Sequence, residues 1–448
     1  MLKTLRFVFL FVTLAGFLAL NYGFTNWVVL VFGLSIPLGH VLAFAALLLA
    51  LPGNWKKAII FLKEPVVLAF IALAILSLGH LVFDLKKYGG YAARDASFLV
   101  ESVFLLLGFL WAQNKKDKSL FLRSLLGVFL VTFLYSLTAV RSDLLLAVSP
   151  VSGVFQRVPI FGIYAFIVFP LQVGALFFIM VAPHITRWSI RLLWVLAILQ
   201  SGWMFLFQHR SSYVTLLVII LLALFLEGIR RAGHIGALHL SGFLVLIFIT
   251  NLLSIWGITL MGRNDEVSVS FYIKQVKTFN PKINVNNVTR TDWRLKIAHE
   301  AIEHWLATPT TIVVGEGFGG ALTDIKIAGV SLVDPSQKLE IAVRQPHNIQ
   351  LTILARFGLV GFIIWIYIQA RFVFLFVRSL RGKKKGSFEH ALKLWLFLFF
   401  ISGIIIASFE PWIEWPFGAI PFFIVLGFAL AFISPHLKKM VENEVSEV

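Results

Sequence analysis

The sequence predicts an all-α polytopic membrane protein with about twelve transmembrane helices and one large extramembrane loop. The 448-residue chain is 59% hydrophobic and only 14% charged, and a single water-soluble core could not enclose that much apolar surface. Its apolar runs also approach the ~20 residues that a helix needs to cross ~30 Å of hydrocarbon. A membrane β-barrel would instead show alternating segments of ~10 residues.

Proline, glycine and charge clusters divide the apolar runs into the expected spans. In chain order these are Leu5 to Tyr22, Trp27 to Leu51, Pro65 to Phe83, Asp95 to Gln113, Leu120 to Val140, Pro159 to Ala182, Ser189 to Phe207, Ser212 to Glu227, His239 to Met261, Asn348 to Val377, Ala391 to Phe409 and Pro416 to Ser434. The first run has a short basic start like a signal peptide, but no small-residue cleavage site precedes the next run. It is therefore expected to remain as a span.

Lysine and arginine gather in alternate loops, and this bias orients the chain because cytoplasmic loops retain positive charge. Basic clusters within residues 56–63, 115–118 and 378–385 lie on the same face as both ends of the chain. Both termini are thus expected to be cytoplasmic. The expected organisation is helices over residues 1–261, a loop on the opposite side over 262–347 and further helices over 348–448. Much of the net charge of +17 then reflects topology and not a nucleic-acid partner.

Several arginines lie at or near the non-cytoplasmic surface, although the charge bias leaves few basic residues there. They are Arg141, Arg157, Arg210, Arg290, Arg294, Arg344 and Arg356. Together these side chains could form one anion-binding site, and the alternative for each is to reach the lipid headgroups. Glu410 and Glu414 flank another outer turn, where they would pair with the arginines or contact a substrate.

The large loop contains an amphipathic helix. Residues 292–307 have helical periodicity, with Trp293 and Ile297 on the apolar face. This face is expected to lie on the membrane surface or to pack over the spans. Arg290 and Arg294 stand one turn apart at the start of the helix, where they either project together toward a phosphate or are solvated beside lipid headgroups.

Two short motifs follow this helix. The stretch from Val313 to Gly320 has four glycines in six residues, and a tight structural turn is favoured because no βαβ unit surrounds it. His347 follows the rigid Pro346 at the outer mouth of a span. There it is either a hydrogen-bonded structural group or a general base, a role to which imidazole is suited near neutral pH.

Several common catalytic signatures are absent from the sequence. It has no cysteine, no Walker loop, no His-Glu-x-x-His and no Gly-x-Ser-x-Gly, and no carboxylates at Asp-x-Asp or Glu-x-Asp spacing. These absences weigh against ATP hydrolysis, zinc proteolysis, serine hydrolysis and metal-dependent glycosyl transfer. No cofactor and no metal ion is expected.

The outer-face motifs follow one another in a recognisable order. They are Arg210 in a short outer turn, Arg290-Thr291-Asp292-Trp293-Arg294, Gly315-Glu316-Gly317-Phe318-Gly319, Pro346-His347-Asn348 and Leu354-Ala355-Arg356-Phe357-Gly358-Leu359. This set resembles the O-antigen ligase family, whose superfamily also includes O-antigen polymerases and bacterial protein O-oligosaccharyltransferases. The resemblance covers residues 208–362 and implies a glycosyltransferase-C-like helical fold in the bacterial inner membrane.

The resemblance also implies an activity and its substrates. These are transfer of a glycan from undecaprenyl pyrophosphate to lipid A-core oligosaccharide on the periplasmic face, in lipopolysaccharide biosynthesis, with membrane lipid as a further partner. Arg210 and one of the pair Arg290 and Arg294 would bind the pyrophosphate, and His347 would activate the acceptor hydroxyl. Arg157 would complete this basic pocket. The family often places an arginine four residues before the tryptophan, whereas Arg290 lies three before it, so the corresponding arginine stays open.

Three other functions remain open at this point. An O-antigen polymerase would use a second lipid-linked glycan as acceptor, and a protein O-oligosaccharyltransferase would use a protein. A transporter or flippase of lipid-linked glycans would also have about twelve spans. Against transport, the polar candidates collect at one face of the membrane and no repeat relates the two halves of the chain.

Overall fold

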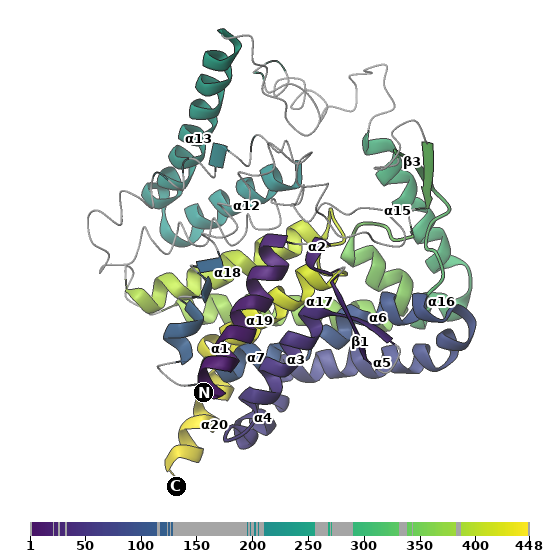
Figure 1. Cartoon of the computed structure of the whole chain (residues 1–448), viewed down its shortest axis with the longest axis horizontal. Helices are drawn as coiled ribbons and strands as arrows, with labels where there is room; N and C mark the ends of the chain where they lie inside the picture. Colours follow the sequence, from purple (N-terminus) through teal and green to yellow (C-terminus); the bar gives the residue numbers. More distant parts are fainter. Residues whose placement is uncertain are drawn as a thin grey trace. The chain divides into compact units, whose positions relative to one another are not determined.

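The computed structural model describes most of the chain outside its middle (Figure 1). The described residues are 2–20, 22–25, 27–31, 34–113, 117–122, 124, 125, 127, 128, 195, 198, 201, 202, 205, 210–255, 268, 270, 290–330, 338–342, 344–381 and 387–446. The chain divides into two compact units. The first comprises Met1–Gly162, Arg294–Lys384 and Ala407–Val448, and the second comprises Ile163–Trp293 and Lys385–Ile406.

Long apolar helices confirm the prediction of a multi-pass helical membrane protein. Five described helices are long and apolar enough to cross a membrane: α5 (Pro65–Tyr88), residues Gly236–Ile255 of α13 (Ile229–Ile255), α17 (Ile349–Leu380), α18 (Phe388–Ala407) and α19 (Pro416–Ile433). A sixth is counted if α3 (Leu38–Ala50) and α4 (Trp55–Leu62), bent by 112°, form one span. The predicted number of about twelve is not confirmed. The predicted spans between residues 120 and 207 lie largely outside the described residues.

The N-terminal region differs from the prediction at its second span. Helix α1 (Leu2–Ala15) continues into the π-helix η1 (Gly16–Leu20), and the short α2 (Tyr22–Thr25) follows. The predicted span from Trp27 to Leu51 is wrong in its first part, because β1 (Val28–Val31) and β2 (Leu34–Pro37) form an antiparallel hairpin there. The Leu38 N–H donates to the Trp27 carbonyl at 2.6 Å and closes this hairpin. A valine-rich apolar run fits a strand as well as a helix, so periodicity alone did not separate them.

A second predicted span, Asp95 to Gln113, is broken into two helices. They are α6 (Gly90–Glu101) and α7 (Phe104–Trp111). At the break the Ser102 N–H donates to Leu99 and the Val103 N–H to Val100, both at 3.2 Å, so the chain tightens to i−3 bonding. The Ser102 hydroxyl also donates to the Leu99 carbonyl at 2.6 Å, which competes with the helical ladder.

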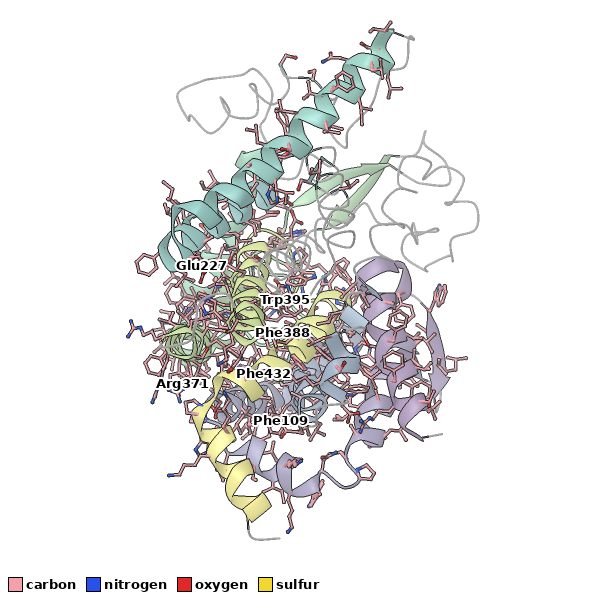
Figure 2. The ribbon with its side chains drawn as sticks, turned by 90° about the vertical axis from the view of Figure 1, so that its left-hand side faces the viewer. Phe109, Glu227, Arg371, Phe388, Trp395 and Phe432 are labelled. Carbon is pink, nitrogen blue, oxygen red and sulfur yellow. The ribbon has the colours of Figure 1, made fainter. Side chains whose placement is uncertain are left out.

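The core of the first unit forms where α19 packs against α7. A Cβ added at Gly108 of α7 would come within 1.8 Å of the Ile424 carbonyl oxygen, so the two helix backbones touch. Such close approach through small residues is typical of helix pairs in membranes. Phe109 of α7 stacks on Phe61 of α4 with ring centroids 4.7 Å apart. Figure 2 labels Phe109 of α7 and Phe432 of α19. The C-terminal α20 (Pro435–Ser446) contacts α4 and α19.

The second unit contains α12 (Arg210–Glu227), α13 and most of α18. Gly228, with a φ of 90°, lets the chain turn between α12 and α13, which pack together. Glu227 at the end of α12 pairs with His390 near the start of α18, and both side chains are buried. Figure 2 labels Glu227 together with Phe388 and Trp395 of α18.

The large loop is structured where it is described. It contains α15 (Arg290–Leu306), α16 (Pro309–Val314) and an antiparallel hairpin of β3 (Lys326–Val330) and β4 (Lys338–Ala342). Helix α15 confirms the predicted amphipathic helix, since Ile297 and Ala301 are buried while Leu295 and His299 are exposed. Thr308 caps α16 through a reciprocal bond pair with Thr311. Helix α16 packs against α17, and α5 packs against both α6 and α17 (Figure 1).

Candidate functional site

The glycine loop, residues 315–320, is a tight turn that fits closely against α17 and α5, as the glycine pattern predicted. Gly315, Gly317 and Gly319 all have positive φ, near 84°. A Cβ at Gly315 would lie 2.2 Å from the Arg356 carbonyl group, and one at Gly317 would lie 2.3 Å from Asp84 Oδ2. The loop therefore requires glycine for both conformation and space.

A break in α17 provides the surface to which this loop bonds. Gly358 has φ 60° and ψ −161°, so the helical hydrogen-bond ladder is interrupted about two and a half turns after α17 begins at Ile349. The carbonyls of Ala355 and Arg356 instead accept the N–H groups of Glu316 at 2.8 Å and Gly317 at 3.1 Å. The loop thus replaces part of the helix's own bonding.

The side chain of Arg356 also holds the glycine loop in place. Its side chain is 1% exposed, and it donates to the Gly317 and Gly320 carbonyls and to Asp95 Oδ2, each at 2.9 Å. A buried guanidinium requires such a set of partners, because desolvation of an unpaired charge is costly. Arg356, predicted as a supporting member of the anionic site, therefore contacts loop carbonyls and a carboxylate of α6.

Two carboxylates and a histidine of α5 and α6 also support the loop, and the sequence reasoning missed them. Asp84 accepts the Phe318 N–H at 2.7 Å, and Asp95 accepts the Gly319 N–H at 3.2 Å. His80 Nε2 lies 2.8 Å from the Val314 carbonyl. The only available signal was that charged residues rarely stand beside apolar membrane runs without a partner.

His347 stands in a short segment, residues 344–348, that is fixed on both sides. The Arg344 carbonyl accepts the Leu322 N–H at 3.0 Å, and Asn348 Oδ1 caps α17 by accepting the Gln350 N–H at 3.0 Å. His347 itself has a φ of 53°, a conformation that costs about 1–3 kcal/mol for a residue with a side chain. The imidazole is therefore held at the N-terminal end of α17 by its surroundings.

Glu410 brings two of the predicted site residues together. It lies in the turn after α18, where its Oε1 accepts a hydrogen bond from Arg294 Nη2 at 2.8 Å. Its Oε2 lies 4.0 Å from His347 Nδ1, a contact that is longer than a hydrogen bond. The side chains of Arg294, Glu410 and His347 are 37%, 15% and 29% exposed, so solvent and solutes reach this cluster.

Glu414 lies in the same turn but is buried. Its Oε1 accepts the Thr352 hydroxyl of α17 at 3.1 Å. Burial raises the pKa of Glu414 to about 7, because the loss of solvent outweighs the Thr352 hydrogen bond and the charge of Arg356. Trp415 Nε1 also donates to Gln345 Oε1 at 3.4 Å, so this turn contacts the His347 segment directly.

Of the other predicted arginines, Arg344 has a described side chain, two are placed only by their backbone and two are not described. Arg210 begins α12 and Arg290 begins α15, and their side chains lie outside the described part. Arg141 and Arg157 fall outside the described residues altogether. Arg344 is described, and its Nη2 donates to the Gly319 carbonyl. In the described ranges, no three His, Asp or Glu side chains are grouped as the ligands of a metal ion would be.

A second histidine contact connects α15 to the glycine loop. His304 Nδ1 lies 3.1 Å from Glu316 Oε2, and Glu300 Oε2 accepts the Asp324 N–H at 3.0 Å. Together with Arg294 and Glu410, these contacts hold both ends of α15 against neighbouring loops.

Comparison with known proteins identifies a family for part of the chain. Residues 192–366 match the model of a family described as O-Antigen ligase, whereas no curated protein matches the chain. The matched segment includes α12, α13, α15, the glycine loop, His347 and the first part of α17; Glu410 lies beyond it in the sequence, and Asp84 and Asp95 lie before it. Over residues 192–366 the chain therefore carries an O-antigen ligase domain, the family that its motifs resembled.

Proposed function

We propose that this membrane protein is an O-antigen ligase. It transfers a glycan from undecaprenyl pyrophosphate to lipid A-core oligosaccharide on the periplasmic face of the bacterial inner membrane. The observation that carries the proposal is the cluster at the N-terminal end of α17, where Glu410 contacts both Arg294 and His347. Two of these three residues belong to the matched family segment.

His347 acts as the general base in this proposal. The acceptor hydroxyl attacks the anomeric carbon of the donor, its proton passes to the imidazole, and the bond from that carbon to the phosphate oxygen breaks. A single displacement of this kind inverts the anomeric configuration. Glu410, beside Nδ1, favours the tautomer with hydrogen on Nδ1, so that Nε2 accepts the proton, and it stabilises the imidazolium that forms.

Arginines stabilise the leaving group. Undecaprenyl pyrophosphate departs with the bonding electrons, and guanidinium groups can bind its oxygens in pairs of charged hydrogen bonds. Arg294 serves here together with Arg210 and Arg290, with Arg157 as a further contributor. Because the donor is already activated and the charge is met by arginine, neither ATP nor a metal ion is required for this step.

The decisive experiment is a transfer assay with the purified full-length protein. The donor is an undecaprenyl-pyrophosphate-linked glycan, and the acceptors, offered separately, are lipid A-core, a second lipid-linked glycan and a peptide. We expect product on lipid A-core alone. Product on the lipid-linked glycan would make the protein a polymerase, and product on the peptide an oligosaccharyltransferase. Glycan translocation across vesicles without any transfer would make it a flippase.

A further inference from the structure

A second basic cluster lies where α5 ends and α6 begins. The guanidinium carbons of Arg344 and Arg94 lie 4.4 Å and 5.2 Å from the ring centroid of Tyr91. The ring is exposed, and the Arg94 side chain is 52% exposed. These three residues are called the Tyr91 platform. Arg94 and Tyr91 were not among the residues that the sequence predicted for a site.

Both cations of the Tyr91 platform are held in place. Asp95 Oδ1 accepts from Arg94 Nε at 3.0 Å and from Nη2 at 2.6 Å. Arg344 donates to the Gly319 carbonyl, and its own carbonyl is bonded to Leu322. A long arginine side chain loses about 2 kcal/mol of rotamer entropy when it is fixed. Because both arginines on this ring are already fixed, a ligand that binds them would not have to order them, and the surface is preorganised.

The platform carries more positive charge than its surroundings neutralise. Asp95 is shared, because its other oxygen accepts from Arg356. Within the described residues, the contacts of Arg344 are to neutral groups, the Gly319 carbonyl and the Tyr91 ring. Exposed Lys86 and Lys87 at the end of α5 add to this charge, which Asp84 and Glu316 offset only in part. The two arginines on one ring carry like charges that repel, and a bound anion would relieve the repulsion.

The platform also lies near the proposed base. Arg344 precedes His347 by three residues, and three residues of chain span at most about 11 Å. The general base contacts the acceptor hydroxyl, whereas the phosphates of the donor are assigned to Arg294, Arg210 and Arg290. We infer that the Tyr91 platform binds a phosphate carried by the acceptor glycan, and so selects an anionic acceptor. This inference rests on the proposed function for the identity of the acceptor.

The test is a binding measurement on the purified full-length protein, without turnover. The probes are lipid A-core with its phosphates and the same glycolipid after phosphatase treatment. We expect the wild type to bind the phosphorylated form about three- to tenfold more tightly at low ionic strength, with the preference shrinking as salt screens the charges. Arg94→Gln should lose most of the preference, and Arg94→Lys should restore part of it.

Lys56→Gln is the matched control, because Lys56 is an exposed cation of α4 and its loss changes the net charge equally. It should keep the full preference. The inference is overturned if the wild type shows no preference, or if Arg94→Gln keeps it with an unchanged thermal midpoint. Tyr91→Leu provides a second variant, which should lower the preference without changing the charge.

Two further measurements separate the source of the anion and the two proposals. Arg94→Gln should leave the affinity for the lipid-linked donor within twofold of the wild type; a fall there alone would assign the platform to the donor and overturn the acceptor assignment. If phosphate preference depends on Arg94 but no glycan is ever transferred, the proposed function fails and the binding site stands. If glycan is transferred but the wild type shows no phosphate preference, the proposed function stands and the inference about the Tyr91 platform fails.

Discussion

His347 combines three features that rarely occur together at a structural histidine. Its backbone is in the left-handed region, its ring is partly exposed, and a carboxylate lies beside one ring nitrogen. Strained backbone that the surrounding structure maintains is found preferentially at functional sites. A histidine with a purely structural role would be expected to bury its ring, so the partial exposure and the strained backbone favour catalysis.

Replacing His347 by alanine should abolish most turnover. Loss of a positioned general base costs typically ~10²- to 10⁴-fold in rate, while the donor should bind with unchanged affinity because its phosphates contact arginines. Single-turnover transfer and donor binding, measured on the purified variant, check both statements. His299→Ala, on the exposed side of α15, is the control and should retain activity within twofold. Unchanged transfer by His347→Ala would exclude it as the base.

Replacing Arg294 by alanine should weaken the binding of the pyrophosphate-linked donor lipid. Hydrogen bonds to charged groups contribute about 1.5–3 kcal/mol, which corresponds to roughly a ten- to hundredfold rise in the donor dissociation constant. Lys296→Ala removes an exposed cation from the same helix and should have little effect. Arg210→Ala and Arg290→Ala should also weaken donor binding. Wild-type donor affinity in all three arginine variants would refute the assignment of these arginines to the pyrophosphate.

Glu414 should make stability depend on pH. Its carboxyl ionises near 4.5 in the unfolded chain and near 7 in the folded protein, so the folded state binds more protons between these values. Stability therefore falls as pH rises from about 4.5 to about 7, by up to about 3 kcal/mol, and is level above that. Glu414→Gln should raise the thermal midpoint at pH 8 and match the wild type near pH 4.5. A difference that is constant across this range would show that ionisation is not its cause.

At the scale of elements, the glycine loop and the break in α17 depend on each other. The loop requires positive φ at three glycines, and the helix gives up bonds at Gly358 that the loop supplies. The sequence predicted the turn from its glycines and α15 from its apolar period. It could not predict that Asp84, Asp95 and Arg356 support the turn. Asp84 and Asp95 are more than two hundred residues from the N–H groups they accept, Arg356 is 36 and 39 residues from the carbonyls it bonds, and local periodicity carries no information on such contacts.

Gly358→Ala should destabilise the protein. Its Cβ would lie 2.4 Å from the Val313 carbonyl carbon, and its φ of 60° is unfavourable for alanine, so we expect a loss of at least about 2 kcal/mol and a lower thermal midpoint. Gly79→Ala in α5 is the matched control, because the residue is helical and, among the described residues, no atom beyond its own stretch of helix lies within 4 Å of the added Cβ. That variant should be neutral or slightly stabilised. Equal midpoints for the two variants would contradict the role of the break.

At the scale of the whole molecule, composition was sufficient to predict a membrane protein, whereas hydropathy was not sufficient to predict the number of spans. A continuous apolar run between Trp27 and Leu51 concealed a hairpin, and the run from Asp95 to Gln113 concealed a break at Ser102. Both are decided by hydrogen bonds that hydropathy does not report. The orientation of the chain rests on its charge bias and stays a prediction.

The lack of cysteine makes this orientation directly testable. Single cysteines can be introduced at His299 of α15 and at Lys56 of α4, both exposed. A membrane-impermeant maleimide added to intact spheroplasts should label His299→Cys and not Lys56→Cys, and permeabilisation should expose both. The reverse labelling would invert the topology and place the cluster around His347 in the cytoplasm.

The break at Gly358 also determines how the protein should lose activity. It leaves Ile349 to Phe357 as a helical piece shorter than ten residues, and helices of that length are marginal without outside support. Because its carbonyls bond to the glycine loop, the two segments should open and close as one cooperative unit, with amide protons that exchange together. Warming would then inactivate the enzyme by melting this small unit while the apolar bundle remains folded.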